Sequence, residues 1–207
     1  TEIYTLSLHD ALPIYRLEFI NNFILVKLIV CLTGMPGSGK STIVSALKAR
    51  GLEALNLGDG VRAEAKKRNL EPTGENLGKL MLELRDKNGP GAVANLLTEQ
   101  IKNSQSEVII IDGVRSTAEI EVLKNVGIVK LLSIEASADT RYKFLGGRGR
   151  SDDPETREKF EERDKREIGV GIGKSMEIAD ETISNSDITL DELTERAYIV
   201  IEKWIES

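Results

Sequence analysis

Eight consecutive residues have the types and spacing needed to bind a polyphosphate. Residues 34–41 read GMPGSGKS and fit the pattern G-x-x-x-x-G-K-[ST], with an apolar run before them and a helical pattern after them. Backbone N–H groups at such a strand-to-helix turn form a nest for phosphate oxygens, and the helix N-terminus adds a favourable dipole. The loop and the next residue therefore predict ATP binding by Gly34, Met35, Pro36, Gly37, Ser38, Gly39, Lys40, Ser41 and Thr42.

Two of these residues and one distant aspartate could supply the charges for phosphoryl transfer. Lys40 is predicted to be catalytic, with its cation on the β- and γ-phosphates, and the Ser41 hydroxyl is a predicted ligand of Mg²⁺. Residues 108–113 read VIIIDG, four apolar residues of a predicted buried strand with Asp112 at its tip. We expect Asp112 to complete the metal site, directly or through water. The alternative is an aspartate that only begins a turn.

A glycine-rich, charged segment contains two further candidates for catalysis. Arg148 and Arg150 have three glycines beside them, which suits a hinged lid that closes over ATP. Phosphoryl transfer spreads negative charge over oxygens, so arginines there would stabilise the transition state. The alternative is a solvated charged loop. Arg163 and Arg166 are three residues apart among glutamates, and this pattern favours surface ion pairs for them.

Alternating strands and helices are expected to position these residues. Apolar runs predict five strands, at residues 24–32, 54–57, 107–111, 127–134 and 181–184. Helical patterns stand between them, residues 59–103 are helical without strands, and capping boxes open helices at Ser116 and Thr189. This order predicts an α/β P-loop NTPase fold, with a doubly wound, mostly parallel sheet and helices on both faces.

The composition is that of an ordinary globular protein. Of the 207 residues, 40% are hydrophobic and 30% charged, and the formal net charge is −6. This charge argues against broad binding to nucleic acid. The single cysteine, Cys31, stands inside an apolar run, so we expect a buried strand residue and no intrachain disulfide.

The first residues differ from the rest of the chain. Residues 1–15 contain TLSLHDALPI and resemble the peptide obtained by translating sequencing-adapter DNA, so we expect residues 1–23 to be an artefactual or disordered extension. The only histidine, His9, lies in this extension. Polar residues interrupt the apolar stretch 19–32, which is therefore shorter than the about 18 uninterrupted apolar residues of a membrane span. We predict a soluble, cytoplasmic protein without a membrane partner.

Two segments resemble the nucleoside monophosphate kinase group, adenylate kinase in particular. LGDGVRAE, residues 57–64, is similar to the acceptor-binding segment of that group, with Asp59 and Arg62 in matching positions. DGVR, residues 112–115, resembles a shortened D-G-F-P-R element. The resemblance implies that Asp59, Arg62 and Arg115 bind the acceptor, with Arg62 on its phosphate.

Two later segments extend the resemblance. RGRSDD, residues 148–153, is similar to the lid arginines and the R-x-D-D motif of adenylate kinases, without an inserted lid domain. Arg163 would be the last arginine of that set. ADETISNS, residues 179–186, resembles the final strand and loop of dephospho-CoA kinases, which implies that the backbone near Asn185 packs on the ATP adenine.

From residue 25 to its C-terminus the chain resembles an archaeal family of P-loop kinases described as dephospho-CoA-kinase-like or adenylate-kinase-like. The resemblance implies a Mg²⁺-dependent kinase that moves the γ-phosphate of ATP to a small nucleotide-like acceptor, a nucleoside monophosphate or dephospho-CoA. It also implies a single domain at residues 24–207, with a helical acceptor-binding region at 59–103 and a short lid at 146–168. The alternative is a nucleotide-binding regulatory ATPase with a protein or RNA partner, which would be favoured if Arg62 and Arg115 pointed away from the phosphate-binding loop.

Overall fold

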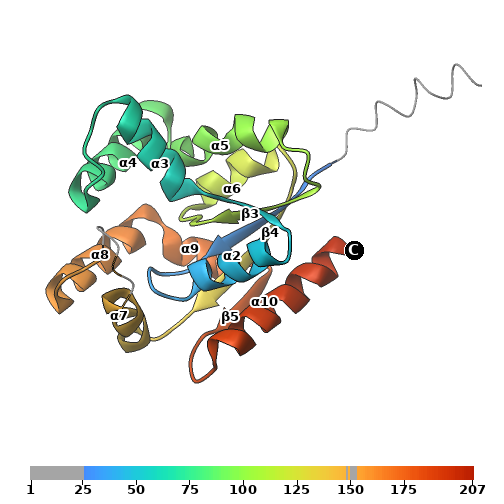
Figure 1. Ribbon diagram of the computed structural model, residues 1–207. Coiled ribbons are helices and arrows are strands. Elements are labelled where there is room, and N and C mark those ends of the chain that lie inside the picture. The colour runs from blue at the N-terminus through green and yellow to red at the C-terminus, as the bar shows by residue number, and fades with distance from the viewer. Residues whose placement is uncertain (1–25, 148, 150–152) are drawn as a thin grey trace, which may run out of the picture.

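The computed structural model describes residues 26–147, 149 and 153–207, and its centre is one parallel sheet (Figure 1). The expected N-terminal extension, Arg148 and Arg150 lie outside the described residues. The strand order is β2-β3-β1-β4-β5, and every neighbouring pair is parallel. The strands are β1 (Leu28–Thr33), β2 (Glu53–Asn56), β3 (Val108–Asp112), β4 (Ile128–Glu135) and β5 (Glu181–Ser184). The predicted α/β fold is confirmed, and the sheet is parallel throughout.

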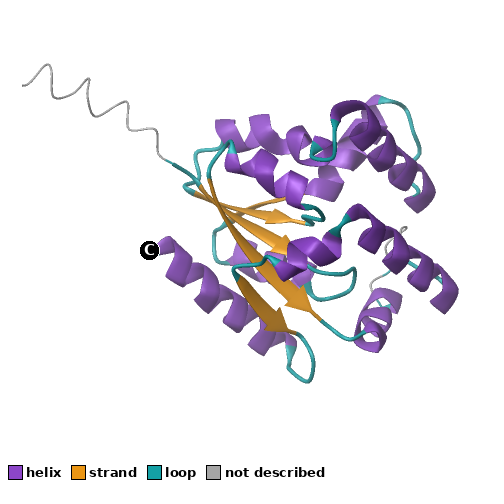
Figure 2. Cartoon of the chain, turned by 180° about the vertical axis from the view of Figure 1, so that it is seen from behind, coloured by secondary structure: helices purple, strands orange, loops and turns teal. Residues whose placement is uncertain are grey.

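Helices cover both faces of this sheet, as seen from behind in Figure 2. They are α2 (Lys40–Ala49), α3 (Leu57–Lys67), α4 (Gly74–Asn88), α5 (Ala92–Asn103), α6 (Thr117–Lys124), α7 (Ala138–Gly146), α8 (Arg157–Val170), α9 (Ile172–Glu177) and α10 (Leu190–Ile205). Alternate residues of β1 belong to two separate cores. Val30 and Leu32 pack with residues of α2 and α10, whereas Ile29 and Cys31 pack with residues of α3, α4, α5 and α6. All four side chains are fully buried, as expected for a strand covered on both faces.

The strand order determines where a ligand can bind. The central strand β1 lies between β3 on one side and β4 on the other, so the chain connections diverge at its carboxyl end. In open α/β sheets, ligands bind in the crevice at such a switch point. The loop GMPGSGKS, residues 34–41, leaves β1 at this point and leads into α2. We call this loop the P-loop.

The structure differs from what the sequence indicates in three places. β1 begins at Leu28, after Lys27, whose Nζ donates to the carbonyl oxygens of Ser104 at 2.6 Å and Ser106 at 3.1 Å. Pro90, a residue type that suits a first helical turn, lies instead in a tight turn before α5, in which the Ala92 N–H donates to the Gly89 carbonyl at 3.0 Å. The short helix α9 was not predicted, because its six residues are too few to show a helical period.

Within the described ranges, no helix combines the length and the apolar character needed to cross a membrane. The cytoplasmic location stays a prediction.

Candidate active site

Arg141 and Asn185 pack tightly against the P-loop. Two of its glycines are required by this packing as well as by the turn. Gly37 and Gly39 have φ angles of 83° and 107°. A Cβ atom on Gly37 would lie 2.6 Å from the carbonyl oxygen of Arg141, and one on Gly39 would lie 2.7 Å from Asn185 Nδ2. Neither position therefore accepts a side chain without a shift of the surrounding backbone or of a buried amide.

Asn185 supports the P-loop from the loop after β5. It is 3% exposed, and its Nδ2 donates to the Ser38 carbonyl oxygen at 3.0 Å. The Asn185 N–H donates to the Glu135 carbonyl oxygen at 2.7 Å, so the residue also continues the pairing of β5 with β4. The contact of its backbone with adenine stays a prediction, while the side chain has a structural role that the sequence did not indicate.

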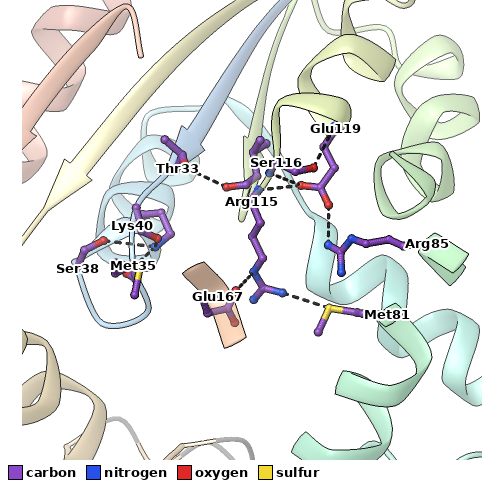
Figure 3. Close-up of polar contacts among 12 residues, drawn as sticks. Thr33, Met35, Ser38, Lys40, Met81, Arg85, Arg115, Ser116, Glu119 and Glu167 are labelled. Carbon is purple, nitrogen blue, oxygen red and sulfur yellow. Dashed lines mark hydrogen bonds and ion pairs between the residues drawn. The ribbon is translucent and has the colours of Figure 1, made fainter. Parts of the chain in front are cut away.

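The ammonium group of Lys40 is turned onto the backbone of the P-loop (Figure 3). Its Nζ donates to the carbonyl oxygens of Gly34 at 2.5 Å and Met35 at 3.0 Å, and to Ser38 Oγ at 3.3 Å. Burial lowers the pKa of Lys40 to about 8, and the charge of Asp112 opposes this shift. A triphosphate would offer this cation charged oxygens in place of neutral carbonyls, which is the exchange that its predicted role requires.

Asp112, the predicted metal ligand, ends β3 beside the P-loop. The strand register pairs it with Leu32 on β1 and with Asn56 on β2, and Asn56 Nδ2 donates to Asp112 Oδ2 at 2.7 Å. Asp112 Oδ1 is buried and has no hydrogen-bond partner within the described part of the chain. A buried carboxylate oxygen without a partner costs free energy, so this atom is suited to a cation or its bound water.

Asp112 and Ser41 line the same cavity and together fit Mg²⁺. Residues 26–147, 149 and 153–207 contain no group of three or more His, Cys, Asp or Glu side chains that could hold a metal ion. Mg²⁺ usually keeps several waters and is held by one or two protein oxygens together with substrate phosphates, and Asp112 and Ser41 supply two such oxygens.

Asn56 connects the metal site to the helix that follows β2. While its Nδ2 donates to Asp112, its Oδ1 accepts a hydrogen bond from the Asp59 N–H at 3.2 Å and caps α3. Asn56 was not singled out in the sequence, although an asparagine directly before a helical pattern is an N-cap signal. Only the register of β2 with β3 shows that the same amide reaches Asp112.

One cavity joins the P-loop to the predicted acceptor residues. Its volume is about 250 Å³, and we call it the P-loop cavity. Besides the loop it is lined by Asn56, Gly58, Arg62, Asp112, Arg115 and Arg163. Arg62 and Arg115 therefore face the phosphate-binding loop, as the resemblance to nucleotide kinases implies, whereas Asp59 pairs with Arg62 at 2.5 Å and is largely exposed. The acceptor roles of these residues stay predictions.

Arg115 is held between two helices that are distant in sequence (Figure 3). Its Nε lies 2.9 Å from Glu167 Oε2 on α8, and its Nη1 contacts the Met81 sulfur on α4 at 3.1 Å. Glu167 is 2% exposed, so it is not available for the surface ion pairs that the sequence suggested. The surface interpretation is also wrong for Arg163, whose side chain is 12% exposed, lines the P-loop cavity and lies 4.0 Å from Asp153.

A buried carboxylate fixes the turn that carries Arg115 (Figure 3). Glu119 Oε2 accepts from the N–H groups of Arg115 at 2.7 Å and Ser116 at 3.2 Å, and its Oε1 pairs with Arg85 on α4 at 2.8 Å. The sequence predicted the capping box of Ser116 and Glu119, which is confirmed. The pairing with Arg85 was not predicted, because it joins residues 34 positions apart.

A second arginine that was not predicted from the sequence connects α7 and α8 to the P-loop. Arg141 on α7 is 5% exposed, and its Nη1 donates to the Pro36 carbonyl oxygen at 3.2 Å. The same guanidinium forms a two-point ion pair with Asp164 on α8, at 2.8 and 2.5 Å, and lies over the Phe160 ring. Arg141 therefore links the P-loop to α7 and α8, and most of α8 lies within the predicted lid segment, residues 146–168.

Comparison with known proteins places these features in a family. A model of the AAA domain matches residues 33–161. A UPF0200 protein of Pyrococcus abyssi is 41% identical over 165 residues, which cover 77% of this chain and 88% of the relative. A UPF0200 protein of Methanothrix thermoacetophila is 40% identical over 183 residues, which cover 86% of this chain and 99% of the relative.

Solved structures with similar folds include two shikimate kinases. The enzyme of Bacteroides thetaiotaomicron aligns with a TM-score of 0.58 at 16% identity, covering 84% of this chain and 98% of that chain. The enzyme of Acinetobacter baumannii, in complex with shikimate, aligns with a TM-score of 0.54 at 17% identity, covering 88% and 97%. At this identity the likeness establishes the fold, a P-loop kinase fold, and not the acceptor.

Proposed function

The chain belongs to the UPF0200 family and contains a match to the AAA domain, and from the geometry of its site we propose that it is a Mg²⁺-dependent kinase of the cytoplasm. It would move the γ-phosphate of ATP to a small nucleotide-like acceptor, such as a nucleoside monophosphate or dephospho-CoA. In this proposal, residues 24–207 form one kinase domain, residues 59–103 form the acceptor-binding region and residues 146–168 form the lid. Arg148 and Arg150 are its proposed catalytic arginines.

The P-loop cavity is the observation that carries this proposal. It brings the P-loop, Asp112, Arg62 and Arg115 to one space of about 250 Å³, although these residues come from three separate stretches of the chain. A nucleotide-regulated ATPase needs the P-loop, the aspartate and one arginine at the γ-phosphate, but it has no acceptor for a second arginine to bind. A kinase needs both, because donor and acceptor phosphates must meet in line.

Each residue then has a definable task. The P-loop N–H groups bind the β- and γ-phosphates, and Lys40 leaves the carbonyl oxygens of Gly34 and Met35 to pair with the γ-phosphate. Asp112 and Ser41 would hold Mg²⁺, which would neutralise charge on the transferring group. Asn56 keeps the Asp112 carboxylate in place through its Nδ2. Arg62, Arg115 and Arg163 bind and orient the acceptor, and their charges stabilise the transition state.

An acceptor screen tests the proposal. The full chain with Mg·ATP is incubated with nucleoside monophosphates, dephospho-CoA and shikimate, and phosphorylated products are identified by mass spectrometry. We expect one acceptor class to be phosphorylated, with ADP released in equal amount. ATP hydrolysis at full rate without any phosphorylated acceptor would contradict the proposal and favour the regulatory ATPase.

A Lys40→Ala variant connects this activity to the P-loop. We expect it to lose turnover and to keep its folded circular dichroism spectrum, because the lysine contacts the surface of its own loop and no buried apolar core. The Lys79→Ala variant is the control, since Lys79 is exposed and pairs only with Glu75 on the same helix among the residues described. Retained turnover in Lys40→Ala would show that the chemistry lies elsewhere.

A further inference from the structure

We propose that the acceptor atom is an oxygen of a phosphate group and not a hydroxyl oxygen, so that the product is a phosphoanhydride. This inference rests on the proposed kinase function and specifies its substrate class. It selects a phosphomonoester such as a nucleoside monophosphate over acceptors phosphorylated on a hydroxyl, which include dephospho-CoA and shikimate.

The two kinds of acceptor require different surroundings. A hydroxyl group holds its proton at neutral pH, so a kinase that phosphorylates it gains from a carboxylate placed to accept that proton. A phosphomonoester has a second pKa of about 6 and is largely a dianion at pH 7. It needs no base, but its approach to the γ-phosphate requires cations that offset the repulsion between the two anions.

A small cavity next to the P-loop cavity has the second kind of surroundings. Its volume is about 60 Å³, and we call it the arginine cavity. Four arginines line it: Arg62, Arg115, Arg163 and Arg166. Glu167 and the apolar side chains of Val61, Leu77 and Met81 complete this part of the lining.

The arginines come from three elements and connect the two cavities. Arg62 is on α3, Arg115 follows β3, and Arg163 is on α8, and all three also line the P-loop cavity. An anion bound among them therefore lies beside the space where the P-loop would hold the γ-phosphate. Arginine fits such an anion because its planar guanidinium donates two parallel hydrogen bonds to phosphate oxygens.

The carboxylates of these two cavities are already committed to other partners. Among the described residues that line the cavities, the carboxylates belong to Asp112 and Glu167. One oxygen of Asp112 accepts a hydrogen bond from Asn56 Nδ2, and the other suits the metal site. Glu167 is buried against the Arg115 guanidinium at 2.9 Å. Both carboxylates thus orient cations or donors, and neither is poised to remove a proton from a hydroxyl group.

The reaction balances without a base. An acceptor phosphate oxygen bonds to the γ-phosphorus of ATP, and the bond from that phosphorus to the β,γ-bridging oxygen breaks. The electron pair of the broken bond stays on ADP, and the acceptor dianion gives up no proton.

Matched acceptor pairs test this inference. The full chain with Mg·ATP is offered each nucleoside 5′-monophosphate beside the same nucleoside without its phosphate, with dephospho-CoA and shikimate in parallel. The linkage in the product is identified by ³¹P NMR. We expect phosphoanhydride products from one or more monophosphates and none from the nucleosides. A phosphate ester formed on any hydroxyl acceptor would overturn the inference and leave the kinase function standing, whereas no transfer to any acceptor would overturn both.

A variant of the cavity rim gives a second test. Arg166 is exposed on one side and lines the arginine cavity on the other, so Arg166→Gln should fold normally. We expect KM for the monophosphate to rise about 10- to 100-fold, the usual loss of a hydrogen bond to a charged group, with KM for ATP nearly unchanged. Arg68→Gln is the matched control, because Arg68 pairs with Glu64 and Glu83 and lines neither cavity. Equal acceptor KM values for the two variants would overturn the inference.

Discussion

The P-loop and the arginine cavity are held in place by different forces. The P-loop is fixed by the shape of its surroundings, because the Arg141 carbonyl and the Asn185 amide lie where a Cβ of Gly37 or Gly39 would stand. The arginine cavity is fixed by charge, because Glu167 holds Arg115 and Glu119 holds the turn that carries it. The difference teaches that the P-loop keeps its shape through close packing, whereas the arginine cavity depends on ion pairs that an anionic ligand could exchange.

The largest expected effect tests whether charge holds the arginine side together. Glu119→Gln leaves the Arg85 guanidinium buried without its ion-pair partner, and we expect the free energy of unfolding to fall by about 3–5 kcal/mol. Urea unfolding of the full chain measures it. The Glu119→Gln/Arg85→Met double variant removes the unpaired charge and should recover part of the loss. Equal stability of the single and double variants would show that packing, and not charge, fixes this region.

The next effect tests whether shape holds the P-loop. Gly39→Ala combines a positive φ with a Cβ pressed against Asn185 and Leu193, and we expect a loss of about 2–4 kcal/mol in stability together with loss of ATP binding. Gly51→Ala is a matched control, since Gly51 has φ +88 and nothing within 4 Å of its Cβ position. Thermal unfolding and calorimetric titration with ATP separate the two. An equally stable Gly39→Ala that still binds ATP would contradict the steric account.

Asn56 lies where the two regions meet, and its replacement should have an intermediate effect. Asn56→Asp keeps an N-cap for α3 but removes the donor to Asp112 and adds a second negative charge. Because residues that orient metal ligands typically contribute about 10- to 100-fold, we expect Mg²⁺ to support ATP-analogue binding with an affinity lower by that factor. Titration with Mg²⁺ measures it, and nucleotide binding without Mg²⁺ is the control. Equal losses in both titrations would contradict a role at the metal site.

The smallest effect concerns the one titrating cation of the P-loop. Because burial lowers the pKa of Lys40 to about 8, the ligand-free chain loses this charge above pH 8. ATP affinity should then be constant below about pH 7 and fall by up to about tenfold per pH unit above 8. Lys40→Arg stays charged and should show a flat profile over the same range. A parallel decline in both proteins would mean that another group titrates.

The lowered pKa of Lys40 also affects stability, and in the opposite direction: ATP affinity falls with rising pH, whereas the free energy of unfolding rises. Between about pH 8 and the ordinary lysine value of 10.5, the unfolded chain binds the proton and the folded chain does not. The Lys40 contribution to the free energy of unfolding of the ligand-free chain therefore rises with pH in this window. Urea unfolding of the wild type and of Lys40→Arg at pH 7 and pH 9.5 measures the difference.

The sequence was informative wherever a pattern is local. The strand at Glu181–Ser184, the capping boxes at Ser116 and Thr189, and the P-loop between β1 and α2 were all predicted from neighbouring residues and are confirmed in the structure. A period of two or 3.6 residues, a cap or a glycine turn acts within a few positions, so the chain records it directly.

Contacts between distant segments were decided by the tertiary structure alone. The pairing of Asn56 with Asp112, of Arg115 with Glu167 and of Arg141 with Asp164 depends on strand register and on how α7 and α8 pack. Charged residues on α8 read as surface partners in the sequence, because helical spacing shows which residues share a face but not what that face meets. The sequence by itself therefore determined the phosphate-binding loop, whereas the packing of α3, α4 and α8 turned separate arginines into one cavity.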